Sequence, residues 1–179
     1  MTNVSNSAKM HKAHAPKSLN FAVFVCSTSR YSSMQKGESQ SDVSGDTIEL
    51  LLKNAGHNVL FRRVISDDKE MIEHAVKSVL DNIGLDAAIF CGGTGITPSD
   101  VTIESVSPFL EKTLPGFGEI FRRLSYDKIG SAAIMSRAVG GVAKGKALFC
   151  IPGSPGAVQI SVELLISLEA PHIVKHARE

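Results

Sequence analysis

Short apolar runs alternate with helix-like segments along the chain, beginning near Asn20. Each run is rich in β-branched and aromatic residues and is bounded by polar or glycine-containing segments, which is typical of β-strands. Strands that alternate with helices form βαβ units, so the pattern predicts an α/β fold, a single three-layer domain with a mainly parallel sheet flanked by helices. The predicted strands are Phe21–Cys26, Asn58–Val64, Asp86–Cys91 and Ala147–Ile151.

Apolar residues at helical spacing predict the helices between the first three strands. The first helix covers Asp46–Asn54, and Gly56 after it is a stop signal. In the second, Asp67 followed by Glu70 fits a capping pattern, and the helix ends near Gly84. The residues expected to face inward are Ile48, Leu51 and Leu52 in the first helix and Ile72, Ala75, Val76 and Val79 in the second.

The second half of the chain is less regular. Helices are predicted over Thr102–Leu110 and Phe117–Tyr126, and a last helix over Gly156–Leu168. Between them, Ser131–Lys146 mixes apolar residues with three glycines, which fits either an irregular segment or a short hairpin.

Length and composition fit one domain, because 179 residues with 43% apolar side chains can build one buried core. Residues 1–18 lack apolar periodicity and cannot bury enough surface to offset their ordering entropy. The sequence therefore predicts a disordered N-terminal tail over 1–18 and the α/β domain over 19–179.

The charge balance argues against binding to nucleic acid or to a membrane through net charge. Nineteen Lys and Arg residues oppose 18 Asp and Glu residues, so affinity for an anion must come from a local site. No run approaches the roughly 18 apolar residues that span a bilayer, and the N-terminus lacks the apolar stretch of a signal peptide. We therefore expect a cytoplasmic protein.

The cysteines Cys26, Cys91 and Cys150 are far apart in sequence, and each lies at the end of an apolar run. No pair has the close spacing of a metal-binding or redox motif. They are interpreted as buried, reduced thiols.

Three of the predicted strands end in loops of small or polar residues, at 27–30, 92–100 and 152–156. The carboxyl ends of parallel strands lie at one edge of a sheet, where ligands bind. A strand followed by Gly-Gly-Thr-Gly and then a helix brings backbone N–H groups close enough to surround a phosphate. These glycines could instead serve only a tight turn. The second glycine loop, at 152–156 and again before a helix, favours a site for a phosphorylated ligand.

Two better-known phosphate motifs are nearly present but incomplete. Gly93-Thr94-Gly95 begins a dinucleotide fingerprint, but Pro98 replaces the third glycine. Gly140–Lys146 has the spacing of a P-loop, but Ala147 stands in place of the metal-binding Ser or Thr, and a strand follows instead of a helix. Neither motif is assigned.

Two carboxylates stand at positions suited to the same site. Asp67 follows the second strand, and Asp100 follows the glycine loop. Either could cap a helix. Together they could hold Mg²⁺ against phosphate oxygens, since this ion is commonly bound by one or two carboxylates plus substrate phosphates.

Four further polar residues have two interpretations each. Asp42 and Ser44 precede the first helix, where N-capping is favoured over ligand contact. Ser136 and Arg137 interrupt an apolar, glycine-rich stretch, as either a solvated loop or part of the site.

In combination, these segments resemble the MoaB/MogA family of molybdenum-cofactor biosynthesis proteins, the molybdopterin adenylyltransferases. No single segment is specific, but five in this order are, and they extend over nearly everything after Leu19. The matching segments are Asp42–Gly45, Cys91–Gly95 with Asp100–Thr102, Pro115–Glu119, Ser136–Gly140 and Ile151–Pro155.

The resemblance implies a MogA-like, molybdopterin-binding fold that assembles as a homotrimer or a homohexamer. It implies transfer of AMP from ATP to the terminal phosphate of molybdopterin, with Mg²⁺ and release of pyrophosphate. The product would then receive molybdate or tungstate, so the molybdate-insertion enzyme is an expected partner. Bacterial MoaB-type members share most of these motifs, so a catalytically silent molybdopterin carrier is the alternative.

The resemblance also implies roles for individual residues. Asp67 and Asp100 fall on the family's two functional aspartates, which makes them the expected catalytic residues and Mg²⁺ ligands. The chain departs from the family after the first strand, where Ser29 precedes Arg30 in place of Asp or Asn. The expected substrate-binding residues are Gly92, Gly93, Thr94, Gly95, Ser136, Pro152, Gly153 and Ser154.

Overall fold

A mixed six-stranded sheet forms the centre of the computed structural model, which describes residues 15–38 and 40–179. The strands are β1 (Asn20–Cys26), β2 (Asn58–Ile65), β3 (Ala87–Cys91), β4 (Lys112–Thr113), β5 (Val139–Ala143) and β6 (Lys146–Ile151). Their order is β2-β1-β3-β6-β5-β4, in which the first four are parallel and β5 and β4 are antiparallel to their neighbours. The four predicted strands and the α/β class are confirmed.

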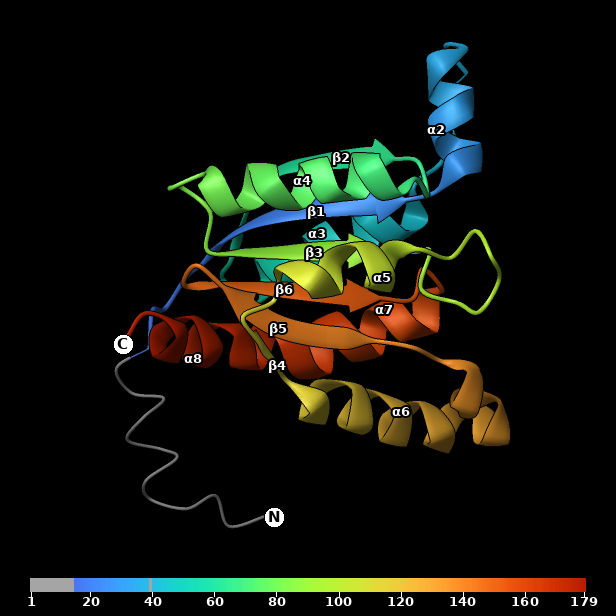
Figure 1. The fold of residues 1–179 in the computed structure, drawn as a ribbon. Helices are drawn as coiled ribbons and strands as arrows, with labels where there is room; N and C mark the ends of the chain where they lie inside the picture. The colour runs from blue at the N-terminus through green and yellow to red at the C-terminus, as the bar shows by residue number, and fades with distance from the viewer. Residues whose placement is uncertain (1–14, 39) are drawn as a thin grey trace.

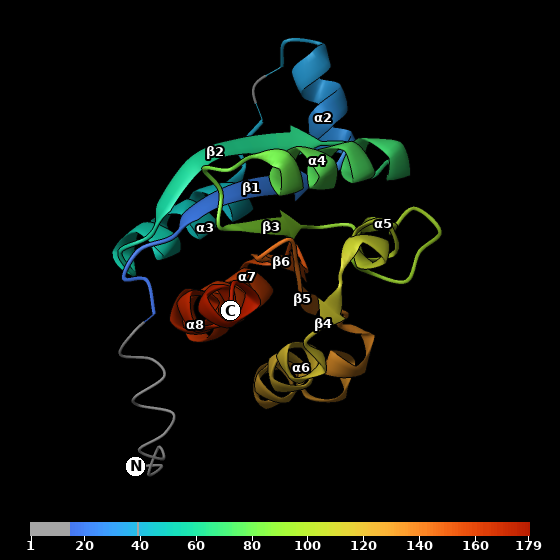
Figure 2. The same ribbon diagram turned by 60° about the vertical axis from the view of Figure 1, so that its left-hand side comes forward.

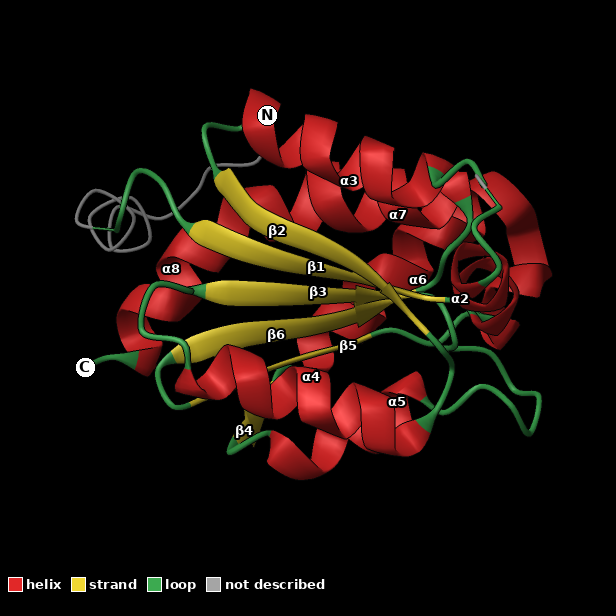
Figure 3. Cartoon of the chain, turned by 90° about the horizontal axis from the view of Figure 1, so that it is seen from above, coloured by secondary structure: helices red, strands yellow, loops and turns green. Residues whose placement is uncertain are grey.

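Helices cover both faces of this sheet (Figures 1 and 3). One face carries α3, α7, η3 and α8, and the other carries α4 and α5. The first group comprises α3 (Val43–Asn54), α7 (Pro155–Ser161), the π-helical turn η3 (Val162–Ile166) and α8 (Ser167–Ala177). The others are α2 (Thr28–Gln35), α4 (Lys69–Asp81), α5 (Thr102–Val106), the 3-10 turns η1 (Ser107–Phe109) and η2 (Gly130–Met135), and α6 (Pro115–Ile129).

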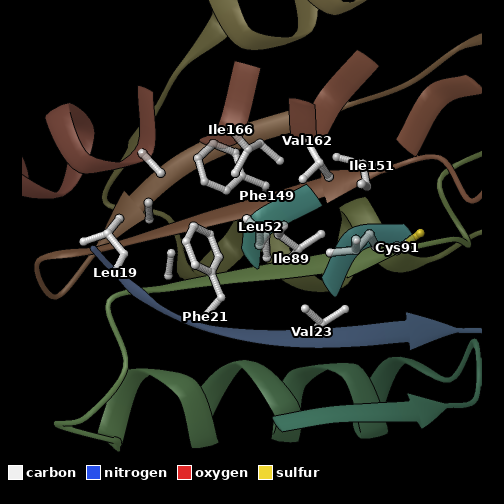
Figure 4. Close-up of a cluster of buried hydrophobic side chains, with 14 of the residues drawn as sticks. Leu19, Phe21, Val23, Leu52, Ile89, Cys91, Phe149, Ile151, Val162 and Ile166 are labelled. Atoms are coloured by element: carbon white, nitrogen blue, oxygen red, sulfur yellow. The ribbon is translucent and has the colours of Figure 1, made fainter. Parts of the chain in front are cut away.

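The two layers of core follow from side-chain alternation in the strands. In β1, Phe21 and Val23 point to the α3 and α8 side, whereas Ala22 and Phe24 point to the α4 side. Figure 4 shows the core cluster on the α3 and α8 side of the sheet. Because the central strands are covered on both faces, they are apolar throughout, as parallel strands in three-layer proteins are.

Some elements differ from the prediction. Helix α2, whose residues are all outside the core, was not predicted, nor was the two-residue strand β4. Residues 131–146 form η2 followed by β5, which pairs with β6 around Lys144 and Gly145, so the hairpin alternative is confirmed for their second part. The last helix continues to Ala177 instead of ending at Leu168. Of the predicted tail, residues 1–14 lie outside the described residues.

The continuous helical segment Pro155–Ala177 has 23 residues and is apolar enough to cross a membrane by length and composition, contrary to the expectation that no run approaches this. It is the one such helix in the described part of the chain. Its apolar side chains at every fourth position are buried against the sheet, which is the pattern of a core helix in a soluble protein. These side chains are Val158, Val162, Ile166, Ala170 and Val174.

Candidate functional site

The two glycine loops lie against each other at the carboxyl edge of the sheet. Neighbouring strands β3 and β6 run parallel, so the loops that follow them leave the sheet side by side. The Gly92 N–H donates to the Ile151 carbonyl at 2.9 Å, and a Cβ on Gly153 would lie 3.5 Å from the Gly92 Cα. The structure therefore brings together segments 60 residues apart in sequence, as predicted from strand direction.

A pocket of about 250 Å³ opens between these loops and the start of β5. Its lining contains seven of the predicted site residues, together with Met135 and Arg137. Ser154 lines an adjoining hollow of about 100 Å³ that shares Ser136 and Pro152 with the pocket, whereas Gly92 and Asp67 line neither. The seven predicted residues in the pocket are Gly93, Thr94, Gly95, Asp100, Ser136, Pro152 and Gly153.

The glycine loop fits closely against both predicted carboxylates, and side chains on it would collide with them. Gly93 has φ +59°, and a Cβ there would lie 2.5 Å from both the Asp67 Oδ1 and the Thr102 Oγ1 atoms. A Cβ on Gly95 would lie 2.7 Å from the Asp100 Oδ2 atom. The bare backbone at 93 and 95 thus lets the loop lie directly against two acidic groups.

Asp100 is held as a carboxylate by the turn that precedes it. Its Oδ2 atom accepts hydrogen bonds from the Thr97 N–H at 2.9 Å and from the Thr97 hydroxyl at 2.6 Å. The hydrogen bond from the Thr97 hydroxyl is the main cause that lowers the pKa of Asp100, and backbone donors and Arg137 act in the same direction. Asp100 is therefore ionised at neutral pH and can face a cation or a polarised ligand.

Asp67 does not cap the helix that follows it, which corrects the capping interpretation. The N-cap of α4 is Asp68, whose Oδ1 atom accepts from the Met71 N–H at 2.9 Å. Asp67 instead reaches across to the start of α2, where its Oδ2 atom accepts from the Thr28 N–H at 2.9 Å and from the Thr28 hydroxyl at 3.1 Å. Its other oxygen, Oδ1, is buried without a hydrogen-bond partner among the described residues.

Arg137 fixes the shape of the pocket from the β5 side. Its Nε atom donates to the Thr94 carbonyl at 3.0 Å, and its Nη2 atom donates to the two carboxylate oxygens of Glu104 at 2.7 and 3.0 Å. The guanidinium therefore ties the glycine loop to α5 and places a positive charge beside the pocket. Lys128 on α6 supplies a second cation beside the adjoining hollow.

The second glycine loop is held by the start of α3. Asp42 is the N-cap, as expected, because its Oδ1 atom accepts from the Gly45 N–H at 3.0 Å. Ser44 lies in the first turn and is buried, and its hydroxyl donates to the Gly153 carbonyl at 2.8 Å. Ser44 thus supports the loop instead of capping the helix.

Sequence reasoning missed Thr28, Thr102, Glu104 and Lys128. Thr28 lies in the segment 27–30 that was predicted as a loop after the first strand, and that position could have drawn attention to it. Glu104 and Lys128 lie on helices at unremarkable exposed positions, and only the tertiary structure brings them to the site.

The three cysteines are buried and unpaired, as predicted. Burial raises the pKa of Cys26 and of Cys91 to about 12, and it raises the pKa of Cys150 well above its usual value. All three are neutral thiols at physiological pH, so none has the thiolate that nucleophilic attack or metal binding requires.

Replacing Arg137 by lysine should weaken binding of ATP, the ligand that the family resemblance implies, about tenfold, or ~1.4 kcal/mol. Lysine keeps the charge but cannot hold Thr94 and Glu104 together. Isothermal titration calorimetry measures the dissociation constant of each variant. The matched control is Arg123→Lys, which changes an exposed arginine paired with Asp127 on α6. Equal affinity in the two variants would contradict the role of Arg137.

At this edge the sheet presents backbone N–H groups beside two carboxylates and a tethered arginine, which is the construction of α/β proteins that bind phosphorylated ligands. Comparison with protein families narrows this class. The family model described as "Probable molybdopterin binding domain" matches residues 22–172, and the chain belongs to this family, among its MoaB/MogA members.

Individual relatives match over nearly the full chain. "Molybdenum cofactor biosynthesis protein B" of Bacillus cereus is 43% identical over 164 residues, which cover 91% of this chain and 93% of that protein. "Molybdopterin adenylyltransferase" of Pyrococcus furiosus is 39% identical over 173 residues, which cover 94% and 97%. Among solved structures, "Crystal structure of Molybdenum cofactor biosynthesis protein B" superposes with a TM-score of 0.81 at 40% identity and covers 92% of this chain and 99% of that one. The predicted family and fold are confirmed.

Proposed function

We propose that this protein acts in molybdenum cofactor biosynthesis by transferring AMP from ATP to the terminal phosphate of molybdopterin, with release of pyrophosphate. The observation that carries the proposal is the contact of one glycine loop with both Asp67 and Asp100 beside a pocket for an anion. The Pyrococcus furiosus relative named molybdopterin adenylyltransferase supports the same reaction.

The pocket is sized for phosphate groups. About 250 Å³ is less than the usual volume of a site that encloses a whole small molecule, so the nucleoside and pterin would extend over the surrounding surface. The backbone of Gly93 and Gly95 would approach one phosphate closely, and Pro152 and Gly153 would face it from the second loop. Ser136 and Ser154 would contact the phosphate in the adjoining hollow.

The oxygen atoms at the site fit a magnesium ion. Asp67 Oδ1 is buried without a partner among the described residues, and a hard oxygen ligand of this kind suits Mg²⁺. Asp67 and Asp100 would hold the ion, and Mg²⁺ bound there would neutralise part of the phosphate charge. A buried oxygen without a hydrogen-bond partner destabilises the folded protein. This cost supports the binding of a cation at Asp67 Oδ1 in the working enzyme.

The chain's own residues would bind and align the two substrates. A phosphate monoester is largely ionised near neutral pH, so an oxygen of the pterin phosphate can attack the α-phosphorus of ATP without a strong base. The bond from that phosphorus to the oxygen that bridges the α- and β-phosphates breaks, and pyrophosphate leaves. Catalysis then depends on positioning and on electrostatic stabilisation by the loop N–H groups and Arg137.

Pyrophosphate release tests the proposal. We expect release only when molybdopterin, ATP and Mg²⁺ are all present. Pterin binding without any release would instead identify a catalytically silent molybdopterin carrier of the same pathway.

An apolar groove of about 350 Å³ between α6 and α8 supports self-association as a trimer or hexamer. Ile120 on α6 lines this groove and is 52% exposed. Replacing Ile120 by glutamate should shift the protein toward the monomer in light scattering, because a charge would enter the buried interface. The control is Ile83→Glu at a fully exposed position in the loop before β3. A wild-type monomer, or an unchanged mass for Ile120→Glu, would contradict the interface.

Within the same proposal, the protein is cytoplasmic, and its adenylylated product passes to the enzyme that inserts molybdate. A phosphoanhydride product is activated for displacement of AMP, so the next reaction must consume it.

A further inference from the structure

Thr28 and Asp67 form a reciprocal hydrogen-bonded pair, and the proposed reaction assigns no role to Thr28. The Asp67 N–H donates to the Thr28 Oγ1 atom at 3.1 Å, and the Thr28 hydroxyl donates to the Asp67 Oδ2 atom at 3.1 Å. The Thr28 N–H donates to the same carboxylate oxygen at 2.9 Å, and the Ser66 hydroxyl lies 3.0 Å from the Thr28 hydroxyl. A threonine hydroxyl has one proton and two lone pairs, so donation to Asp67 and acceptance from the Asp67 N–H and Ser66 use its full capacity.

This pair divides the Asp67 carboxylate into two differently used oxygens. Oδ2 is occupied by two donors from Thr28, whereas Oδ1 lies against Gly93 without a partner among the described residues. A carboxylate held at one oxygen cannot rotate freely, so the other oxygen has a fixed direction. Partners that orient a metal-ligating carboxylate in this way typically change metal affinity 10- to 100-fold when they are removed.

We propose that Thr28 is a positioning residue that fixes the Asp67 carboxylate so that its free oxygen is presented to a divalent metal ion bound with ATP. The inference rests on the proposed function for the identity of that ion. It assigns to the first residue of α2 a role that is absent from the predicted site.

The location of Thr28 adds a structural consequence. It is the first residue of α2, and none of the residues Thr28–Gln35 is buried. Figures 1 and 2 show α2 projecting from the body of the molecule beyond the sheet. Because few contacts hold α2 by packing, the hydrogen bonds to Asp67 link the placement of this helix to that of the carboxylate.

The test titrates Mn²⁺, as a paramagnetic substitute for Mg²⁺, into the full-length protein saturated with a non-hydrolysable ATP analogue. Enhancement of water-proton relaxation reports metal bound to the slowly tumbling protein complex. The variants are Thr28→Val, which keeps the shape and removes the hydroxyl, and Thr28→Ser, which restores the hydroxyl. Thr47→Val is the matched control, because the exposed Thr47 hydroxyl donates only to the Val43 carbonyl within α3.

We expect Thr28→Val to weaken Mn²⁺ binding about tenfold, with Thr28→Ser and Thr47→Val within about twofold of wild type. Wild-type affinity in Thr28→Val would overturn the proposal, as would equal losses in the valine and serine variants or the absence of a wild-type Mn²⁺ complex. Because the measurement needs no turnover, a protein that fails to release pyrophosphate but shows this pattern would refute the adenylyl transfer and leave the role of Thr28 intact.

Discussion

Replacing Asp100 by asparagine is expected to reduce the rate of AMP transfer by about 100-fold or more while leaving the fold intact. Removal of one preorganised electrostatic group commonly has an effect of this size. Asparagine keeps the shape of the side chain but loses the charge, and its amide is a poorer acceptor for the two Thr97 donors. The rate of pyrophosphate release at saturating substrates measures the effect, and thermal unfolding monitors the fold.

Asp81→Asn is the matched control for this change. Asp81 is an exposed carboxylate on α4 that pairs with Lys144 at 3.0 Å, away from the glycine loops. The Asp81→Asn variant should retain the wild-type rate of pyrophosphate release. If Asp100→Asn kept more than about a tenth of the wild-type rate, Asp100 would not be part of the catalytic machinery.

Replacing Gly92 by alanine is expected to lower the free energy of unfolding by about 2–4 kcal/mol or to prevent soluble expression. Gly92 has φ +105°, and an added Cβ would lie 2.3 Å from the Cys26 carbonyl oxygen, a backbone atom in the central strand β1. Neither the loop nor the strand can move without disturbing the sheet, so the collision cannot be relieved locally. Urea denaturation monitored by circular dichroism measures the loss.

Gly56→Ala separates this collision from backbone strain alone. Gly56 follows α3 with φ +86°, but an added Cβ would meet nothing within 4 Å. The Gly56→Ala change should lower the free energy of unfolding by about 1 kcal/mol, as for other glycines that end helices. A Gly92→Ala protein as stable as Gly56→Ala would show that the loop has more freedom than the structure indicates.

The buried strands could be predicted because burial on both faces leaves a strong signal in the sequence. β1, β3 and β6 are continuous apolar runs, and the helices that cover them carry apolar residues at helical spacing. The direction of these strands then predicts that the glycine loops meet. Hence most of the pocket could be found before the structure.

Elements stabilised by few apolar contacts could not be predicted in this way. Helix α2 has no buried residue to create a periodic pattern, and β4 has two exposed residues. The last helix continues through Pro171 because Ala170 and Val174 remain packed on the sheet. Tertiary packing there outweighs the backbone hydrogen bond that proline removes.

The position of Asp67 shows a different limit of the sequence. Two adjacent aspartates precede α4, and the capping pattern alone does not distinguish them. The choice depends on Thr28, which is 39 residues earlier in the chain and meets Asp67 only because β1 and β2 are paired. The contacts of Arg137 also could not be predicted from the sequence, because its hydrogen bonds to Thr94 and Glu104 join three separate segments.

Transfer of the α-phosphate label of ATP to molybdopterin tests the central claim most directly. Purified protein would be mixed with molybdopterin, Mg²⁺ and ATP labelled with ³²P at the α-phosphate, with the Asp67→Asn, Asp100→Asn double variant run in parallel. The account predicts labelled pterin from the wild-type protein and none above background from the double variant. Equal labelling by both proteins, or no labelled pterin from a wild-type protein that binds both substrates, would contradict it.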